Sequence, residues 1–432
     1  MERCTYILPR QSAPPIKTQA GPSVHKRYEL LDMMRAVAAL WVMLYHYRVT
    51  LGESGEGSWY LVGLNHGYLG VAIFFVISGY CIMASLQRMR RKRESGGRFM
   101  LNRALRIMPT YWMALIVMAF LPFVAAGAGW LAGNGFTINR LTWWKIMQMD
   151  IIGWVKQLTL TSALGGGEYR TYLLFPFNGI CWSLAIEMQF YVVMAITLLF
   201  GMRQKWVMAS VLVLGLLSMN PAQWFETGEA CMRSADWMIE GTFLPYWSMF
   251  FVGVLGYELI ERGIYPKRIR QACLENKREV TWWLGMAIFV NILSLWVTKM
   301  NANTITATAT GVCLWGMYGV QFKMGALEKI KCWIKHTMMR LGEMSYSIYL
   351  MHLLLMSSAV NIAKIWYRDN GFAMYLIACL SCLLMCAAFY YACEKPMTLL
   401  IKRWRNKRKP NHDAMSASES ITKIQPHDRM AA

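Results

Sequence analysis

The chain has 432 residues, of which 56% are hydrophobic and only 16% are charged. A soluble protein of this length could not bury so much apolar surface, since about a quarter of the residues of soluble domains are charged. The composition therefore excludes an ordinary soluble protein and indicates an integral membrane protein. The net charge of +21 would suggest a nucleic-acid partner for a soluble chain; here it indicates basic cytoplasmic loops instead.

Ten stretches of the chain are apolar and long enough to cross a bilayer, which takes about 20 helical residues. Several of them lack charged residues altogether, and no soluble helix set shows so many such runs. The sequence predicts an all-α fold, a polytopic membrane helix bundle of about ten transmembrane helices. The predicted spans are 31–51, 67–86, 108–132, 182–202, 206–222, 241–259, 280–299, 300–322, 343–363 and 372–394.

The distribution of Lys and Arg predicts the direction of these spans. If both termini are cytoplasmic, 35 of the 45 Lys and Arg residues fall in cytoplasmic segments, as the positive-inside rule requires. The loops 52–66 and 221–240, which then lie outside, are acidic. An eleventh span at 146–164 would place the basic loops 262–278 and 323–340 outside. Asp150 and Lys156 also interrupt this apolar stretch. We therefore expect that segment to be an external amphipathic or re-entrant piece.

Composition divides the chain into a membrane domain and two polar ends. Residues 1–27 form a polar cytoplasmic arm without a cleavable signal, 28–398 form the membrane domain, and 399–432 are a basic tail predicted to be disordered. The pair Cys379-x-x-Cys382 has the spacing of a metal site, but it lies in a long uncharged run without companion ligands. We expect a helix there and no bound metal.

Ionisable residues inside membrane spans are costly, so they are candidates for function. Arg35 and His46 lie eleven residues apart on the first span, about 16 Å along a helix. Counting from the span ends places Glu187 of the fourth span at the depth of His46. A carboxylate that orients an imidazole is the usual arrangement of a general base. We therefore name His46, Glu187 and Arg35 as catalytic candidates, although a buried histidine bonded to a carbonyl remains an alternative.

Arg103 and Arg106 end a basic segment that begins at Arg88. Most of that segment is explained by topology and anionic lipid, but these two lie at i and i+3 on one helix face. Paired guanidinium groups suit phosphate oxygens, which arginine binds through two hydrogen bonds. His352 lies near the middle of the ninth span, close to Tyr349; Tyr and Ser at such spacing are also explained by hydrogen bonds between helices.

The order of these motifs resembles that of the acyltransferase-3 family of integral membrane O-acyltransferases, of the carbohydrate O-acetyltransferase type. The resemblance covers about 28–398, and six motifs in sequence carry it. Ala72 departs from the family pattern, in which many members have Asp. The matching motifs are Arg35-x10-His46, Gly70-Val71-Ala72-Ile73-Phe74-Phe75-Val76-Ile77-Ser78-Gly79, Arg103-Ala104-Leu105-Arg106, Trp182-Ser183-Leu184-Ala185-Ile186-Glu187, Ser345 to His352, and Glu394-Lys395-Pro396.

The resemblance implies transfer of an acyl group, usually acetyl, from cytoplasmic acyl-CoA to a hydroxyl of a cell-envelope carbohydrate or glycolipid. The placement of the residues fits this activity, since Arg103 and Arg106, with Arg35 as a further candidate, could bind the phosphates of acetyl-CoA, a donor substrate and not a permanent cofactor. The acceptor-binding candidates are Trp182, Ser183, Tyr349 and His352. Expected partners are membrane lipids, acyl-CoA and the acceptor, without nucleic acid, at a bacterial cytoplasmic (inner) membrane. The acceptor, the acyl group and the oligomeric state stay open.

Two other classes of protein fit the pattern less well. A transporter also has about ten spans and buried His, Glu and Arg, but transporters commonly contain internal repeats. We find no self-similarity between the two halves of the chain, and the polar motifs concentrate in spans one to four and nine. A receptor or scaffold without catalysis would leave His46 and Glu187 without a purpose inside the membrane. The sequence therefore favours an enzyme.

Overall fold

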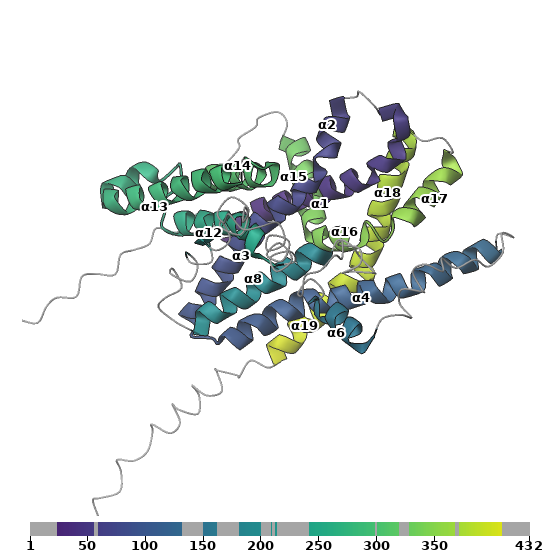
Figure 1. Ribbon diagram of the computed structural model, residues 1–432, viewed down its shortest axis with the longest axis horizontal. Helices are drawn as coiled ribbons and strands as arrows, with labels where there is room; N and C mark the ends of the chain where they lie inside the picture. Colours follow the sequence, from purple (N-terminus) through teal and green to yellow (C-terminus); the bar gives the residue numbers. More distant parts are fainter. Residues whose placement is uncertain are drawn as a thin grey trace, which may run out of the picture.

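The computed structural model describes residues 24–55, 59–131, 150–161, 181–199, 209, 212–213, 242–298, 300–318, 328–367 and 371–407. Every regular element among them is a helix (Figure 1). The α-helices are α1 (Val24–Tyr47), α2 (Trp59–Asn65), α3 (Gly70–Arg91), α4 (Gly96–Leu131), α6 (Ile151–Thr159), α8 (Cys181–Leu199), α12 (Trp247–Glu261), α13 (Ile269–Val297), α14 (Ala302–Met317), α15 (Glu328–Glu343), α16 (Ser345–Met351), α17 (Met356–Trp366), α18 (Phe372–Phe389) and α19 (Lys395–Lys407).

Five of the described helical stretches are long and apolar enough to cross a membrane: Gly67–Arg91, Gly96–Leu121, Cys181–Leu198, Ile269–Val297 and Phe372–Arg405. A sixth crossing is possible if α16 and α17 count as one span. The all-helical membrane fold agrees with the expectation from sequence. The count of ten and the cytoplasmic termini stay predictions, since the expected span at 206–222 lies almost wholly outside the described residues.

The ninth predicted span, 343–363, is not one continuous helix. It consists of α16 and α17, which meet at 86° across the turn at His352–Leu355. The His352 side chain shares the Ile348 carbonyl with its own backbone amide, at 2.9 Å and 3.0 Å. The backbone hydrogen bond of His352 is thus retained, and the helix direction changes immediately after this residue. The Tyr47 hydroxyl then donates to the His352 carbonyl at 3.1 Å, so this carbonyl has a partner at the break.

The end of the chain is more helical than the sequence suggests. The helix continues from α18 through a π-turn at Tyr390–Glu394 into α19, which reaches Lys407. This range enters the segment 399–432, for which disorder is expected. Residues 408–432, like the arm up to residue 23, lie outside the described part of the chain.

The short helix α6 contacts the middle of α4. Tyr111 donates to the Gln157 carbonyl at 2.8 Å, and the Trp112 indole donates to the Leu158 carbonyl at 3.0 Å. The other face of α6 exposes apolar side chains, such as Ile151. Nine helical residues cover about 14 Å, less than half of the ~30 Å hydrocarbon core. This helix is therefore too short to be an eleventh span, and its re-entrant placement stays a prediction.

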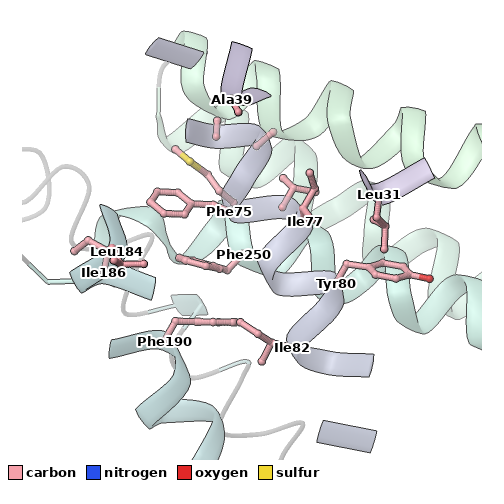
Figure 2. Packing of buried hydrophobic residues seen from close by; sticks show 14 of the residues in the cluster. Leu31, Ala39, Phe75, Ile77, Tyr80, Ile82, Leu184, Ile186, Phe190 and Phe250 are labelled. Carbon is pink, nitrogen blue, oxygen red and sulfur yellow. The ribbon is translucent and has the colours of Figure 1, made fainter. Parts of the chain in front are cut away.

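Helix α3 crosses α12 at very close range, and two glycines make this possible. A Cβ on Gly79 would lie 2.0 Å from the Phe250 carbonyl oxygen, and one on Gly253 would lie 1.9 Å from that of Val76. Close approach of backbones at small residues is the usual way in which membrane helices associate. Beside the crossing, the Phe250 ring lies between Phe75 and Phe190, with centroids 4.6 Å and 4.1 Å away (Figure 2).

Replacing Gly253 by alanine should destabilise the fold. The added methyl group forces the backbones of α3 and α12 apart, and overpacking of this kind costs about 1–3 kcal/mol. Gly285→Ala is the matched control, because its Cβ would meet nothing within 4 Å. Thermal unfolding of the detergent-solubilised proteins measures the difference. Equal melting temperatures for the two variants would show that the crossing is loose.

Candidate active site

The first predicted residue, Arg35, lies on α1 and reaches across to α3. Its guanidinium donates to Asp32 Oδ1 at 3.0 Å and to Cys81 Sγ at 3.2 Å. The charge of Arg35 also interacts with that of Glu187 on α8. Only 19% of the Arg35 side chain is exposed, so this cation is held between helices and not in bulk solvent.

Glu187 is held by two hydroxyl groups. Ser78 of α3 donates to Glu187 Oε1 at 2.6 Å, and Tyr191, one turn further along α8, donates to the same atom at 2.5 Å. These bonds connect the second and fourth motifs of the sequence. These two hydrogen bonds therefore fix the Glu187 carboxylate on the side of the site where Arg35 lies.

Arg103 and Arg106 of α4 lie in the same region but in different surroundings. Arg103 is buried, donates to the Cys81 carbonyl at 3.4 Å and lies 5.4 Å from the Tyr191 ring centre. Arg106 remains exposed, and its charge interacts with those of Arg35 and Arg103. Neither Arg103 nor Arg106 forms an ion pair with any acidic residue that the structure describes. Three guanidinium groups thus gather on this side of the site, next to the carboxylates of Asp32 and Glu187.

The closing motifs join this arginine cluster, defined as Arg35, Arg103 and Arg106. Ser347 of α16 donates to Glu394 Oε2, and the charge of Glu394 interacts with that of Arg106. Tyr346 donates to the Ile107 carbonyl at 3.0 Å, one residue beyond Arg106. Motifs separated by almost 300 residues in sequence therefore meet around α4.

His46, near the C-terminal end of α1, has a second histidine as its neighbour. The rings of His46 and His352 lie 5.3 Å apart between centroids, at an interplanar angle of 41°. His46 is partly exposed, whereas His352 is completely buried. His352 Nδ1 bonds to the Ile348 carbonyl at 2.9 Å, and its Nε2 has no hydrogen-bond partner among the described residues.

The expected contact between His46 and Glu187 is not present. No hydrogen bond or ion pair joins these two described residues, and Glu187 interacts with Ser78, Tyr191 and Arg35 instead. The structure holds the Glu187 carboxylate at Ser78 and Tyr191, whereas the His46 ring lies next to that of His352. The catalytic roles of His46 and Glu187 stay predictions.

Of the remaining predicted residues, Ser183 and Tyr349 lie beside the histidine pair. The Ser183 and Tyr349 hydroxyls are hydrogen-bonded to each other, and the Tyr349 ring is 6.2 Å from that of His352. Trp182 packs elsewhere, against Phe75 and Tyr246 at centroid distances of 6.4 Å and 5.4 Å. Trp182 thus contributes to helix packing in this structure, and the structure does not bring it to the histidine pair.

Sequence reasoning did not assign roles to Ser78, Tyr191 and Tyr47. Ser78 stands inside the second motif and Tyr191 lies one helical turn beyond the fourth, but only the fold shows that both hold Glu187. Tyr47 follows His46 directly and binds the backbone at the α16–α17 break. A tyrosine at that position is indistinguishable by sequence from an interfacial aromatic residue.

Comparison with known proteins gives a consistent match. A protein family described as "Acyltransferase domain" matches residues 28–391. Nodulation protein 10 of Rhizobium leguminosarum bv. viciae is 26% identical over 348 residues, which cover 77% of this chain and 83% of that protein. The peptidoglycan O-acetyltransferase OatA of Listeria monocytogenes is 29% identical over 202 residues, 44% of this chain but only 27% of that protein. No solved structure matches the chain significantly.

Proposed function

Because this chain belongs to the acyltransferase-3 family of membrane O-acyltransferases, we propose that it acylates a cell-envelope carbohydrate or glycolipid. The donor is cytoplasmic acyl-CoA, in the simplest case acetyl-CoA, and the acceptor group is a hydroxyl. The relative named as a peptidoglycan O-acetyltransferase supports both the acetyl group and an envelope acceptor. The protein would work in a bacterial cytoplasmic membrane, surrounded by lipid and without a permanently bound cofactor.

One observation carries this proposal: the arginine cluster lies beside the middle of α1 and the histidine pair near its C-terminal end, along one face of that helix. Arg35 and His46 are eleven residues apart, close to three full helical turns, so their side chains leave the helix in nearly the same direction. The separation of about 16 Å suits a long, thin donor that is anionic at one end and reactive at the other.

The arginine cluster would bind the phosphate groups of CoA. Arg106 is exposed and is the first contact for an incoming anion, while Arg35 and the buried Arg103 are fixed by hydrogen bonds to Cys81. Guanidinium groups that are already held in place lose little conformational freedom on binding phosphate. Glu187 would balance part of the positive charge while the site is empty and keep the three cations together.

His46 would act as the general base. A ring nitrogen of His46 takes the proton of the acceptor hydroxyl, the oxygen attacks the thioester carbonyl, and the CoA thiolate leaves as the C–S bond breaks. His46 is partly exposed, as a base that must meet an acceptor has to be. Ser183 and Tyr349, buried next to His352, would border the acceptor.

Glu187→Gln should reduce the rate of acyl transfer by about tenfold, which corresponds to ~1.4 kcal/mol, and thus less than loss of the base. The amide keeps an oxygen for Ser78 and Tyr191 but removes the charge that faces Arg35. Because that charge lies beside the arginine cluster, the slower transfer should appear as a higher apparent KM for acyl-CoA. Glu343→Gln, at the exposed end of α15, is the control. Unchanged kinetics in Glu187→Gln would remove this residue from the mechanism.

The proposal is tested by mass spectrometry of cell-envelope glycans and glycolipids. Cells with the wild-type gene, without it, and with His46→Ala are compared. We expect one component to lose the mass of a single acyl group in both altered strains. Identical envelopes in all three strains would contradict the proposed function.

A further inference from the structure

One ring nitrogen of His352 forms a hydrogen bond, whereas the other has no hydrogen-bond partner among the described residues. The Ile348 carbonyl can only accept, so His352 Nδ1 carries the proton of that 2.9 Å hydrogen bond. In the neutral ring Nε2 is then a bare acceptor. It is completely buried and has no partner among the described residues. A buried acceptor without a donor is rare in native structures, and a catalytic role is one of the explanations for such an atom.

The nearest ring that can supply such a donor is His46. The two ring centroids are 5.3 Å apart. This separation accommodates one N–H···N hydrogen bond of about 2.9–3.0 Å between ring nitrogens that point at each other. The interplanar angle of 41° is compatible with that bond, and the His46 ring is partly exposed.

The surroundings of His352 hold it firmly in this position. Its carbonyl accepts from the Tyr47 hydroxyl at 3.1 Å, and the Cys382 thiol of α18 lies 4.0 Å from the same oxygen. Tyr47 is the residue after His46, so the helix that carries the proposed base is tied directly to the backbone of its neighbour. The break between α16 and α17 therefore lies where the His352 ring contacts that of His46.

We propose that His352 is the positioning residue of this site: its Nε2 accepts a ring N–H of His46 and aims the other nitrogen of His46 at the acceptor hydroxyl. This inference rests on the proposed function. It replaces the carboxylate expected from sequence with an imidazole, because Glu187 is bound to Ser78 and Tyr191. When His46 takes the hydroxyl proton, the hydrogen bond to His352 becomes charge-assisted and strengthens, which favours the transition state over the ground state.

Two variants at position 352 separate positioning from packing. His352→Gln can place an amide oxygen near the position of Nε2, whereas His352→Leu has a similar bulk and no acceptor. His336→Gln, on an exposed part of α15, is the matched control. Initial rates are measured in membrane vesicles of the producing cells with radiolabelled acetyl-CoA at varied concentration, and the amount of folded protein is measured alongside.

For His352→Leu we expect kcat to fall about 100-fold, the lower end of what a general base contributes, with an unchanged KM for acetyl-CoA. His352→Gln should recover about a tenth or more of the lost rate. In a His46→Ala background neither change should have a further effect, because His352 acts through His46. A merely structural role would reduce folded protein or act equally in both backgrounds.

The outcomes distinguish this inference from the proposed function. If wild type transfers acetyl, His46→Ala does not, and His352→Leu is as fast as wild type, the positioning role is wrong and the function stands. If both 352 variants fail to fold, His352 is structural and the positioning role is also wrong. If wild type itself transfers no acetyl from acetyl-CoA while His46→Ala behaves identically, the proposed function fails.

Discussion

His46→Ala is expected to slow acyl transfer by about 10²–10⁴-fold, the contribution of a positioned general base. The side chain is partly exposed, so its removal leaves little buried space and the protein should still insert and fold. The rate is measured as release of free CoA from acetyl-CoA in the presence of the envelope acceptor. His66→Ala provides a matched control, because His66 is exposed and lies outside the site.

A His46→Ala protein that folds and transfers acyl groups at a near-normal rate would show that His46 is structural. In that case the pairing with His352 would be one more contact between α1 and the α16–α17 break. The same assay with His66→Ala guards against a general loss of activity through damage to the membrane domain.

Replacing Arg103 and Arg106 together by Gln should raise the apparent KM for acyl-CoA steeply. Each charge-assisted hydrogen bond that is lost weakens binding by roughly 1.5–3 kcal/mol, which is about 10- to 150-fold. The KM for the acceptor should change much less, because the cluster lies three helical turns from His46 along α1. Arg→Lys at both positions should restore only part of the affinity, since an ammonium group cannot form the guanidinium fork.

Calorimetry of acyl-CoA binding to detergent-solubilised protein separates this role from a topological one. The control is the double variant Lys92→Gln with Arg93→Gln, which removes the same charge from exposed positions of the same basic segment. We expect it to bind acyl-CoA like wild type. Undiminished affinity in the Arg103 and Arg106 double variant would assign that pair to membrane topology alone.

The membrane class and the family could be predicted from the sequence because they depend on composition and on local motifs. The Arg35-x10-His46 spacing, for example, fixes a common helix face wherever that helix lies. The gathering of Arg103 and Arg106 with Arg35 could be anticipated only in part. Their i and i+3 spacing predicts one face, but the fold buries Arg103 and leaves Arg106 exposed.

The partner of His46 could not be predicted, since it depends on how the helices pack against one another. The fold holds Glu187 at Ser78 and Tyr191 and brings the ring of His352, which is distant in sequence, next to that of His46. The break at His352 was equally hidden. No proline or glycine marks it, and hydropathy records neither the turn nor the hydrogen bonds around it.

The most direct test of the account uses purified protein in proteoliposomes with an envelope extract from the producing cells and radiolabelled acetyl-CoA. The account predicts that the label appears on a carbohydrate or glycolipid, with one free CoA released for each acetyl group transferred, and that His46→Ala releases none. Label that enters the vesicles on an intact acyl-CoA or solute, without cleavage of the thioester, would contradict acyl transfer and identify the protein as a transporter.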